Sequence, residues 1–208
     1  MDMQLYSQLI ELGYRRSGSH TYRPHCRHCE QCIPCRAPVN RFRPNRSQRR
    51  CLQINKNCST HLVKAAYTDE HFELYRCYIN ARHAHGNMAN PVPEDYKSFL
   101  YSDWSDTFFL ELRENSQLLA VAVCDHVHSG LSAVYSYYAP DAPNRSLGTY
   151  CVLKMIEHTK LMDLEYLYLG YLIENSNKMK YKQCFRPLEA FIDNRWQDYH
   201  GSNPSVSL

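Results

Sequence analysis

Long apolar segments are absent from this sequence of 208 residues. No hydrophobic run approaches the roughly 18 residues needed to cross a bilayer, so no membrane partner is expected. The first residues, Met1 to Tyr6, also lack the basic and apolar regions of a secretory signal. We therefore predict a cytoplasmic protein, in whose reducing surroundings the ten cysteines are thiols or metal ligands rather than disulfides.

Acidic residues are scarce in one part of the chain. Residues 14–56 contain eleven lysines and arginines and a single acid, Glu30, which gives a net charge of +10, whereas all other residues together carry −7. A compact basic region joined to an acidic body is typical of proteins that bind a phosphate backbone. The alternative is a solvated basic surface without a partner.

Four cysteines stand at a constant three-residue step inside this basic region, at Cys26, Cys29, Cys32 and Cys35. Thiolates at this spacing can surround one metal centre. The spacing differs from that of a bacterial ferredoxin, and structural zinc sites usually pair two distant Cys-x-x-Cys segments. We predict a zinc or iron–sulfur site that uses at least three of these thiolates. Reduced cysteines in a loop are the alternative.

The hydrophobic pattern predicts a layered α/β fold. Helices are expected at residues 1–13, 47–56, 69–82, 93–101, 147–159 and 177–183, and strands at residues 107–112, 118–124, 131–138 and 165–171. Residues 14–40, with three prolines, are expected to form a metal-braced loop region. In the strand at 131–138, alternation predicts one shared face for Leu131, Ala133, Tyr135 and Tyr137. The order of elements in the C-terminal half favours helices layered on a sheet.

Several polar residues on these elements are candidates for chemistry. Seventeen tyrosines is a high count, and because buried hydroxyls need partners, their clustering on the strands predicts a polar cleft; amphipathic core packing is the alternative. Asp125 ends a buried strand and is a candidate base or amine-binding carboxylate, or only a turn cap. Arg82 and His83 could bind a carboxylate, or form an internal salt bridge. Gly148 opens a helix whose N-terminus could bind phosphate, although a simple loop would look the same.

Taken together, these segments resemble the bacterial aminoacyl-tRNA–protein transferases, and among them the aspartate/glutamate leucyltransferases most closely. The eukaryotic arginyltransferases are more distant relatives. The matching strings are Gly13-Tyr-Arg-Arg-Ser-Gly18, Tyr22-Arg-Pro-His-Cys26-x-x-Cys29-x-x-Cys32, Phe42-Arg-Pro-Asn-Arg-Ser-Gln-Arg-Arg50, Arg82-His83, Ala120-Val-Ala-Val-Cys-Asp125, Gly130-Leu-Ser-Ala-Val-Tyr-Ser-Tyr-Tyr138, Ser146-Leu-Gly148, Tyr168-Leu-Gly-Tyr171 and Lys178-Met-Lys-Tyr-Lys182.

The resemblance implies an enzyme of the N-degron pathway, with aminoacyl-tRNA as co-substrate and proteins bearing N-terminal Asp or Glu as acceptors. It implies a GNAT-like acyltransferase domain at residues 61–208 and a Cys/Arg-rich module at residues 1–60 that binds metal and tRNA. No DNA partner is expected. Leucine is the expected donated residue, with arginine as the alternative. A metal-braced nucleic-acid adaptor without activity, or a transferase that uses acyl-CoA, are rival functions.

The residue patterns and the resemblance together give a set of expected site residues, in which Arg82 and His83, or Lys178 and Lys182, would bind the acidic side chain of the acceptor. The expected catalytic residues are Asp125, Tyr135, Tyr137 and Tyr168; the substrate-binding residues are Arg82, His83, Tyr171, Lys178, Tyr181 and Lys182; the tRNA-binding residues are Arg43, Arg46, Arg49, Arg50, Arg145 and Gly148; and the metal ligands are Cys26, Cys29, Cys32 and Cys35. Family members generally begin with a further segment carrying a Pro-Cys-Ser-Tyr-type motif, which this chain is expected to lack. Cys35 stands where they have an apolar residue, so it either replaces the missing ligand or is incidental.

The expected mechanism is direct attack of a neutral α-amine on the aminoacyl ester, without a covalent enzyme intermediate. Backbone N–H groups near residues 135–138 would stabilise the oxyanion. Asp125 or a tyrosine-bound water would accept the proton.

Overall fold

A computed structural model describes residues 1–82, 86 and 88–201. Its strands are β1 (Arg15–Ser17), β2 (His20–Tyr22), β3 (Ile33–Pro38), β4 (Ser59–Lys64), β5 (Thr107–Glu114), β6 (Gln117–Val127), β7 (Gly130–Tyr138), β8 (Tyr166–Leu172), β9 (Glu189–Ile192) and β10 (Arg195–Asp198). Its helices are α1 (Met3–Glu11), α2 (Arg46–Ile54), α3 (Asp69–Arg82), α4 (Pro93–Leu100) and α5 (Leu147–Leu161), with the 3₁₀ turns η1 (Pro143–Arg145) and η2 (Lys180–Cys184).

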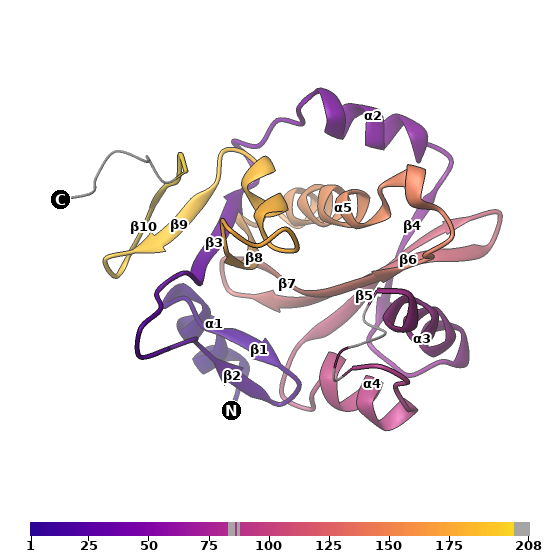
Figure 1. The fold of residues 1–208 in the computed structure, drawn as a ribbon, viewed down its shortest axis with the longest axis horizontal. Coiled ribbons are helices and arrows are strands. Elements are labelled where there is room, and N and C mark those ends of the chain that lie inside the picture. Colours follow the sequence, from indigo (N-terminus) through magenta and orange to yellow (C-terminus); the bar gives the residue numbers. More distant parts are fainter. Residues whose placement is uncertain (83–85, 87, 202–208) are drawn as a thin grey trace.

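One eight-stranded sheet runs through the protein in the order β10-β9-β3-β8-β7-β6-β5-β4, and β1 and β2 form a separate hairpin. Figure 1 shows α2 and α5 over one face of the sheet, and α3, α4 and the α1–β1–β2 segment over the other. Among the described residues, none of the helices combines the length and apolar character that crossing a membrane requires. The predicted mixed α/β sheet is thus confirmed.

The predicted helices in the first 161 residues are confirmed, whereas the helix predicted at residues 177–183 is a turn followed by the 3₁₀ turn η2. Two of the helix starts have clear physical causes. Asp2 caps α1 by accepting a hydrogen bond from the backbone N–H of Leu5 at 2.8 Å. At the start of α2, Asn45 accepts from the N–H of Gln48, and the Gln48 side chain accepts from the N–H of Asn45, which closes a capping box. Helix α3 spans the predicted residues 69–82.

The predicted loop at residues 14–40 is wrong in part, because it contains three strands. Strand β3 lies between β8 and β9 in the main sheet despite Pro34 and Pro38. Its ladder with β9 involves only Cys35 and Arg36, so both prolines lie outside that short ladder. The edge strands β4 and β10, and β9 next to β10, were not predicted either. Because β3 belongs to the main sheet, the predicted boundary at residue 60 divides one continuous sheet.

The two central strands β7 and β8 diverge along their length. Among the described residues they are the only parallel pair of the main sheet. Their ladder there consists of Gly130–Tyr166, Leu131–Leu167 and Ser132–Tyr168, although both strands continue well beyond these residues. A Cβ atom on Gly130 would lie 2.0 Å from the carbonyl oxygen of Tyr166, so glycine is what allows the two strands to start side by side.

A β-bulge on each strand coincides with the divergence. On β7, Tyr135 and Ala133 face consecutive residues of β6, which leaves Val134 as the extra residue. On β8, Gly170 and Tyr168 face consecutive residues of β3, which leaves Leu169 extra. A bulge bends the strand that carries it. We call the resulting opening, between residues 133–138 of β7 and 169–172 of β8, the fork.

The β7 bulge also changes which side chains share a face. Leu131 and Ala133 pack in the core under α5, whereas Tyr135 and Tyr137 pack on the opposite side, with α3 and α4. The predicted common face of these four residues is therefore wrong, because one extra residue reverses the alternation.

Candidate active site at the fork

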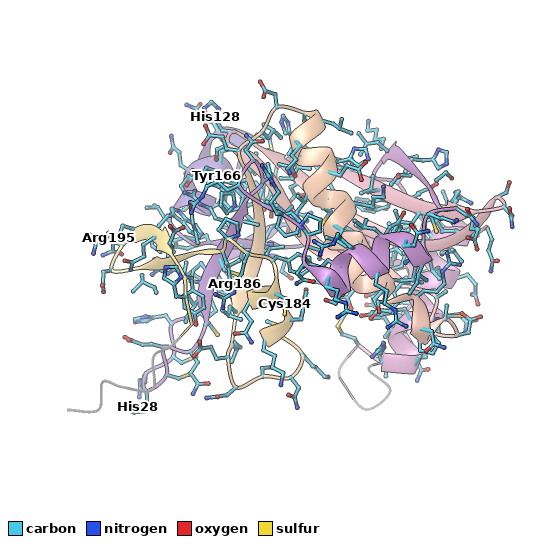
Figure 2. The ribbon with its side chains drawn as sticks, turned by 90° about the horizontal axis from the view of Figure 1, so that it is seen from above. His28, His128, Tyr166, Cys184, Arg186 and Arg195 are labelled. Atoms are coloured by element: carbon cyan, nitrogen blue, oxygen red, sulfur yellow. The ribbon has the colours of Figure 1, made fainter. Side chains whose placement is uncertain are left out.

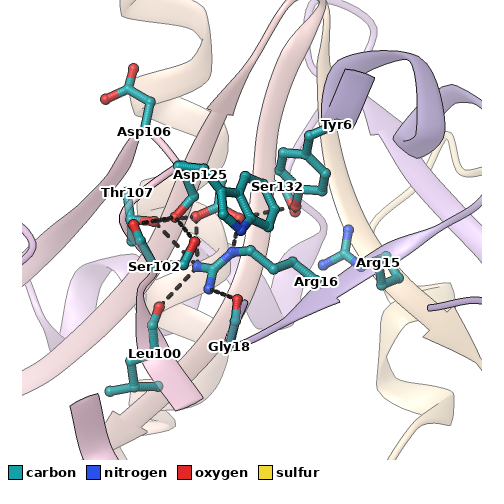
Figure 3. Close-up of polar contacts among 12 residues, drawn as sticks. Tyr6, Arg15, Arg16, Gly18, Leu100, Ser102, Asp106, Thr107, Asp125 and Ser132 are labelled. Carbon is teal, nitrogen blue, oxygen red and sulfur yellow. Dashed lines mark hydrogen bonds and ion pairs between the residues drawn. The ribbon is translucent and has the colours of Figure 1, made fainter. Parts of the chain in front are cut away.

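Asp125 lies on β6 with no exposed side-chain surface, and both of its oxygens are occupied. Arg16 donates from Nε to Oδ2 and from Nη2 to Oδ1, each at 2.7 Å. The hydroxyls of Tyr6 and Thr107 donate at 3.0 and 2.6 Å. Figure 3 shows this network, in which Arg16 also donates to the carbonyl oxygens of Gly18 and Leu100.

This geometry gives Asp125 a role different from the predicted one. A fully buried carboxylate that accepts four hydrogen bonds offers no free oxygen to a substrate proton. It instead holds Arg16, and through it β1, against the main sheet. Bidentate arginine–carboxylate pairs fix geometry particularly well.

Arg15, the preceding residue on β1, enters the fork. Its Nη2 donates to the carbonyl oxygen of Ala133 on β7 at 2.5 Å, and its Nη1 donates to that of Tyr168 on β8 at 3.3 Å. Gly170 has φ = +84°, and a Cβ built there would come within 3.5 Å of the Arg15 Nε. Glycine therefore provides the left-handed backbone conformation at a position in direct contact with the guanidinium.

Lys182 approaches the same strands from η2. Its buried ammonium donates to the carbonyl oxygen of Tyr171 at 2.5 Å. Burial lowers the pKa of Lys182 to about 8, and the nearby charge of Arg15 adds to this shift. The predicted substrate-binding residue Lys182 thus lies at the fork, whereas the Lys178 side chain is exposed to solvent.

The open edge of the fork continues to the start of α5. Residues 133–136 of β7 are only half-buried, although β7 is an interior strand and β6 beside it is almost wholly buried. At the end of β7, a Cβ on Gly148 would lie 3.1 Å from the Tyr138 ring, so α5 begins directly against that ring. The guanidinium of Arg82 lies 5.7 Å from the ring centroid. His83 lies outside the described residues.

The tyrosines predicted as catalytic differ in what their hydroxyls do. Tyr137 bonds to the hydroxyl of Tyr96 at 2.9 Å. Tyr168 donates to Glu11 and contacts Ser129, which commits it to α1 and the β6–β7 turn. The buried Tyr135 hydroxyl has no hydrogen-bond partner in the described part of the chain, and burial raises its pKa. Of these three, only Tyr135 offers a free polar group.

The other tyrosines near β8 have separate surroundings. Tyr171 donates its hydroxyl to the carbonyl oxygens of Gly13 and Tyr22, so it fastens the N-terminal segment rather than facing an open site. The Tyr181 ring is largely exposed beside Lys182.

The arginines predicted to bind tRNA fall into two groups. Arg43, Arg46, Arg49 and Arg50 are exposed on and just before α2, and none forms an ion pair with a described carboxylate. Arg145 instead pairs with Glu114 at 2.8 Å and donates to Asn55. Its guanidinium joins η1 to neighbouring elements and is not free for a phosphate.

The cysteine ladder is not assembled into one site. Cys35 is buried in β3, donates its thiol to the carbonyl oxygen of Gly170 and has its pKa raised to about 11 by burial. Cys26 and Cys29 are exposed in a turn, and Cys32 is half-buried. His28 lies at the outer end of this segment (Figure 2).

No group of three or more metal-ligating side chains is arranged around a common point within residues 1–82, 86 and 88–201. The four thiols therefore do not fit a shared metal centre in this arrangement. No step of the proposed reaction is routed through a metal.

Sequence reasoning missed Arg15 and Arg16 as site residues. Both belong to the Gly13–Gly18 string, where they contributed only to the count of positive charges. Adjacent residues of a strand point to opposite sides, so an Arg-Arg pair in a short strand can serve two different partners. The adjacent arginines could therefore have indicated a site, but only if residues 15–17 had been predicted as a strand.

Solved structures of similar fold define the class. The chain matches the structure of L-PGS from Bacillus licheniformis with a TM-score of 0.52 and 14% identity, over 85% of this chain and 51% of that one. It matches FemX with a TM-score of 0.52 and 7% identity, over 84% of this chain and 61% of that one. At these identities the likeness concerns the fold alone, which is of the acyltransferase type.

Sequence comparisons give the family. Models of the arginine-tRNA-protein transferases match residues 1–50 for the N terminus and 70–192 for the C terminus. The chain is 49% identical over 197 residues to an aspartate/glutamate leucyltransferase of Nitrosococcus oceani, and 47% identical over 196 residues to one of Pseudomonas putida. Each alignment covers 94% of this chain and 83% of the relative. The chain therefore belongs to the aminoacyl-tRNA–protein transferase family and is an aminoacyltransferase.

Replacement of Asp125 by Asn tests its structural role. Removing one partner of a buried ion pair leaves Arg16 charged and uncompensated, so the free energy of unfolding should fall by about 3–5 kcal/mol. Chemical denaturation measures this decrease. In protein that remains folded, the pH profile of transfer should keep its shape. An unchanged stability together with a lost acidic limb of the profile would restore the role of Asp125 as a base.

Tyr135→Phe and Tyr137→Phe form a matched pair. Tyr137→Phe leaves the buried Tyr96 hydroxyl without its hydrogen-bond partner, so it should lower the free energy of unfolding by about 1–2 kcal/mol. Tyr135→Phe removes a buried hydroxyl without a partner, so stability should hold or rise, while kcat falls about 100-fold if that hydroxyl serves the transition state. Denaturation and steady-state transfer assays measure both. Equal destabilisation by the two changes would contradict the assignment.

Proposed function

We propose that this protein transfers leucine from Leu-tRNA to the N-terminal amine of proteins that begin with Asp or Glu, and that the fork is where the transfer occurs. The names of the relatives support the donor and the acceptor. The main support for placing the transfer at the fork is the divergence of β7 and β8 after three paired positions. It leaves the backbone of an interior strand unpaired on one edge, next to a buried guanidinium.

The reaction needs positioning more than strong acid–base chemistry. An ester to a ribose hydroxyl is already activated, and an α-amine with a pKa of about 8 is partly neutral at physiological pH. The amine nitrogen attacks the ester carbonyl carbon, the amide bond forms, and the bond to the ribose oxygen breaks. The amine proton leaves through water and the ribose oxygen takes up a proton, so no oxidant, reductant or covalent enzyme intermediate is required.

Two kinds of donor can stabilise the oxyanion of this reaction. Backbone N–H groups of β7 after Ser132 lack a partner on β8 and line the open edge. The Tyr135 hydroxyl is a buried group without a partner among the described residues. Donors fixed in a water-poor site contribute far more than the same groups in water.

The tRNA would lie along α2. Helix α2 contains no acidic residue that would compete with phosphate for its exposed arginines. On α2, the Cys51 thiol donates a hydrogen bond of 3.6 Å to the carbonyl oxygen of Ser146, the residue directly before α5 begins. Since Gly148 in the first turn of α5 abuts Tyr138 at the end of β7, a backbone bound on α2 could direct the charged end of the tRNA to the fork.

We further propose that the enzyme works in the cytoplasm within an N-degron pathway, with aminoacyl-tRNA and acidic N-termini as its partners and without DNA. A metal is not part of this proposal, because no three metal-ligating side chains surround a common point in the described part of the chain. Arg82 and Tyr181, near the open end of the fork, are the remaining candidates for contacts to either substrate.

A transfer assay with two charged tRNAs tests the function. Purified protein is given tRNA charged with labelled leucine or labelled arginine, and a peptide that begins with Asp. Label should pass from Leu-tRNA to the peptide, and little from Arg-tRNA. Transfer from Arg-tRNA alone would make the protein an arginyltransferase. Transfer from acyl-CoA instead, or binding of tRNA without transfer, would overturn the proposal.

Replacement of both Arg49 and Arg50 by Ala tests the tRNA surface. The KM for Leu-tRNA should rise, and the slope of its logarithm against the logarithm of salt concentration should fall by about 1 for each phosphate that the variant no longer neutralises. Arg195→Ala removes an exposed charge from the β9–β10 hairpin and serves as the control. Equal effects of the two variants, or an unchanged salt slope, would remove α2 from the tRNA interface.

A further inference from the structure

Four long cationic side chains are buried among the described residues: Arg15, Arg16, Arg36 and Lys182. Arg16 pairs with Asp125, and Arg36 pairs with Glu11 and Glu189 at 2.9 and 2.8 Å. Arg15 and Lys182 have no such partner: no described carboxylate lies within ion-pair distance of either. Two of the four buried cations, Arg16 and Arg36, are therefore paired with carboxylates, whereas Arg15 and Lys182 at the fork have no described carboxylate as partner.

We propose that Arg15 and Lys182 together form the pocket that binds the side-chain carboxylate of the acceptor's N-terminal Asp or Glu. This inference rests on the proposed function, and it names the residues that select the acceptor. A buried charge without a counter-ion is costly, and a carboxylate from the substrate would remove that cost. Arginine is also suited to binding a carboxylate through two parallel hydrogen bonds.

The remaining contacts of both cations are consistent with this role. Within the described part of the chain, Arg15 donates only to the carbonyl oxygens of Ala133 and Tyr168. Lys182 donates to the carbonyl oxygen of Tyr171 and to the sulfur of Met179. Carbonyl oxygens orient a cation without neutralising it. These hydrogen bonds attach one cation across both strands of the fork and the other to its β8 side.

Nearby thiols do not act as the missing counter-ions. Burial raises the pKa of the Cys35 thiol to about 11, so it is neutral at physiological pH. The pKa of Cys32 is raised as well, first by burial. Gly170, at φ = +84°, lies directly beside the Arg15 guanidinium, because a Cβ built there would be in van der Waals contact with it.

The position of the pocket fits the reaction. An α-amine and its own side-chain carboxylate are only a few bonds apart. A carboxylate held by Arg15 and Lys182 would therefore keep the attacking nitrogen beside the open edge of β7, where the oxyanion donors lie. Selectivity for acidic N-termini would then come from the same place as the positioning of the nucleophile.

The test compares peptides that begin with Asp and with Asn, which have the same shape but differ in charge. In Lys182→Met the ratio of kcat/KM for Asp over Asn should fall by about 10- to 100-fold, because a charge-assisted hydrogen bond to the carboxylate is removed. The KM for Leu-tRNA should not change. Lys182→Arg should recover part of the preference, and Lys180→Met, an exposed neighbour on η2, should keep all of it. Arg15→Lys provides a second variant that retains a donor in the fork.

Direct binding of the two peptides without tRNA separates this inference from the proposed function. Calorimetry should find wild-type protein binding the Asp peptide more tightly than the Asn peptide, with the difference abolished in Lys182→Met, whichever amino acid is transferred. An unchanged Asp preference in both Lys182→Met and Arg15→Lys would overturn the pocket while leaving leucyl transfer intact. A higher KM for Leu-tRNA with the preference retained would assign the cations to the tRNA instead.

Discussion

The ion pair between Arg16 and Asp125 joins the N-terminal segment to the main sheet. Strand β1 is only three residues long and hydrogen-bonds to β2 rather than to the eight-stranded sheet. A carboxylate on β6 and a guanidinium on β1, locked in two hydrogen bonds, set the position of that short strand. Because neighbouring residues of a strand point to opposite sides, fixing Arg16 on Asp125 directs Arg15 into the fork. The site therefore depends on an interaction that takes no part in the chemistry.

The two substrates place different electrostatic demands on the protein, and two different arrangements of positive charge meet them. The arginines along α2 are exposed and can follow a phosphate backbone, and their attraction is screened by salt. Arg15 and Lys182 are buried, so their attraction for a carboxylate is screened much less. A long polyanion and a single small anion can thus be bound by one basic protein without competing for the same residues.

Much of the architecture could be predicted from local pattern, and the failures have identifiable physical causes. Helix α3 follows from its apolar spacing, and α2 from a capping box between Asn45 and Gln48. Strand β3 was not predicted because it contains two prolines. The strand tolerates them because its ladder with β9 involves only two described residues, neither of which is a proline. One bulge at Val134 reversed the expected faces of the β7 tyrosines. A bulge arises from the pairing of two strands, so it cannot be predicted from the sequence of one strand alone.

The candidate site was harder to predict than the fold. Asp125 was singled out because it ends a buried strand, but its partner Arg16 lies 109 residues earlier, so its structural role could not be inferred locally. Lys182 was chosen from a family motif, whereas its burial beside Arg15 is a tertiary property. Cys35 was grouped with the other cysteines by spacing alone, yet its pairing with Gly170 on β8 removes it from their turn. In each case the deciding partner comes from another part of the chain.

Photo-crosslinking with an acceptor peptide tests most directly whether the fork is the transfer site. A peptide that begins with Asp and carries a photoreactive second residue is irradiated with the intact protein, and the attachment points are mapped by mass spectrometry. We predict attachment to residues 133–138 of β7 and 170–172 of β8, suppressed by an excess of unlabelled Asp peptide but not of Asn peptide. Attachment confined to another surface, such as the recess of about 320 Å³ lined by Arg43, Arg186 and His200, would contradict the account.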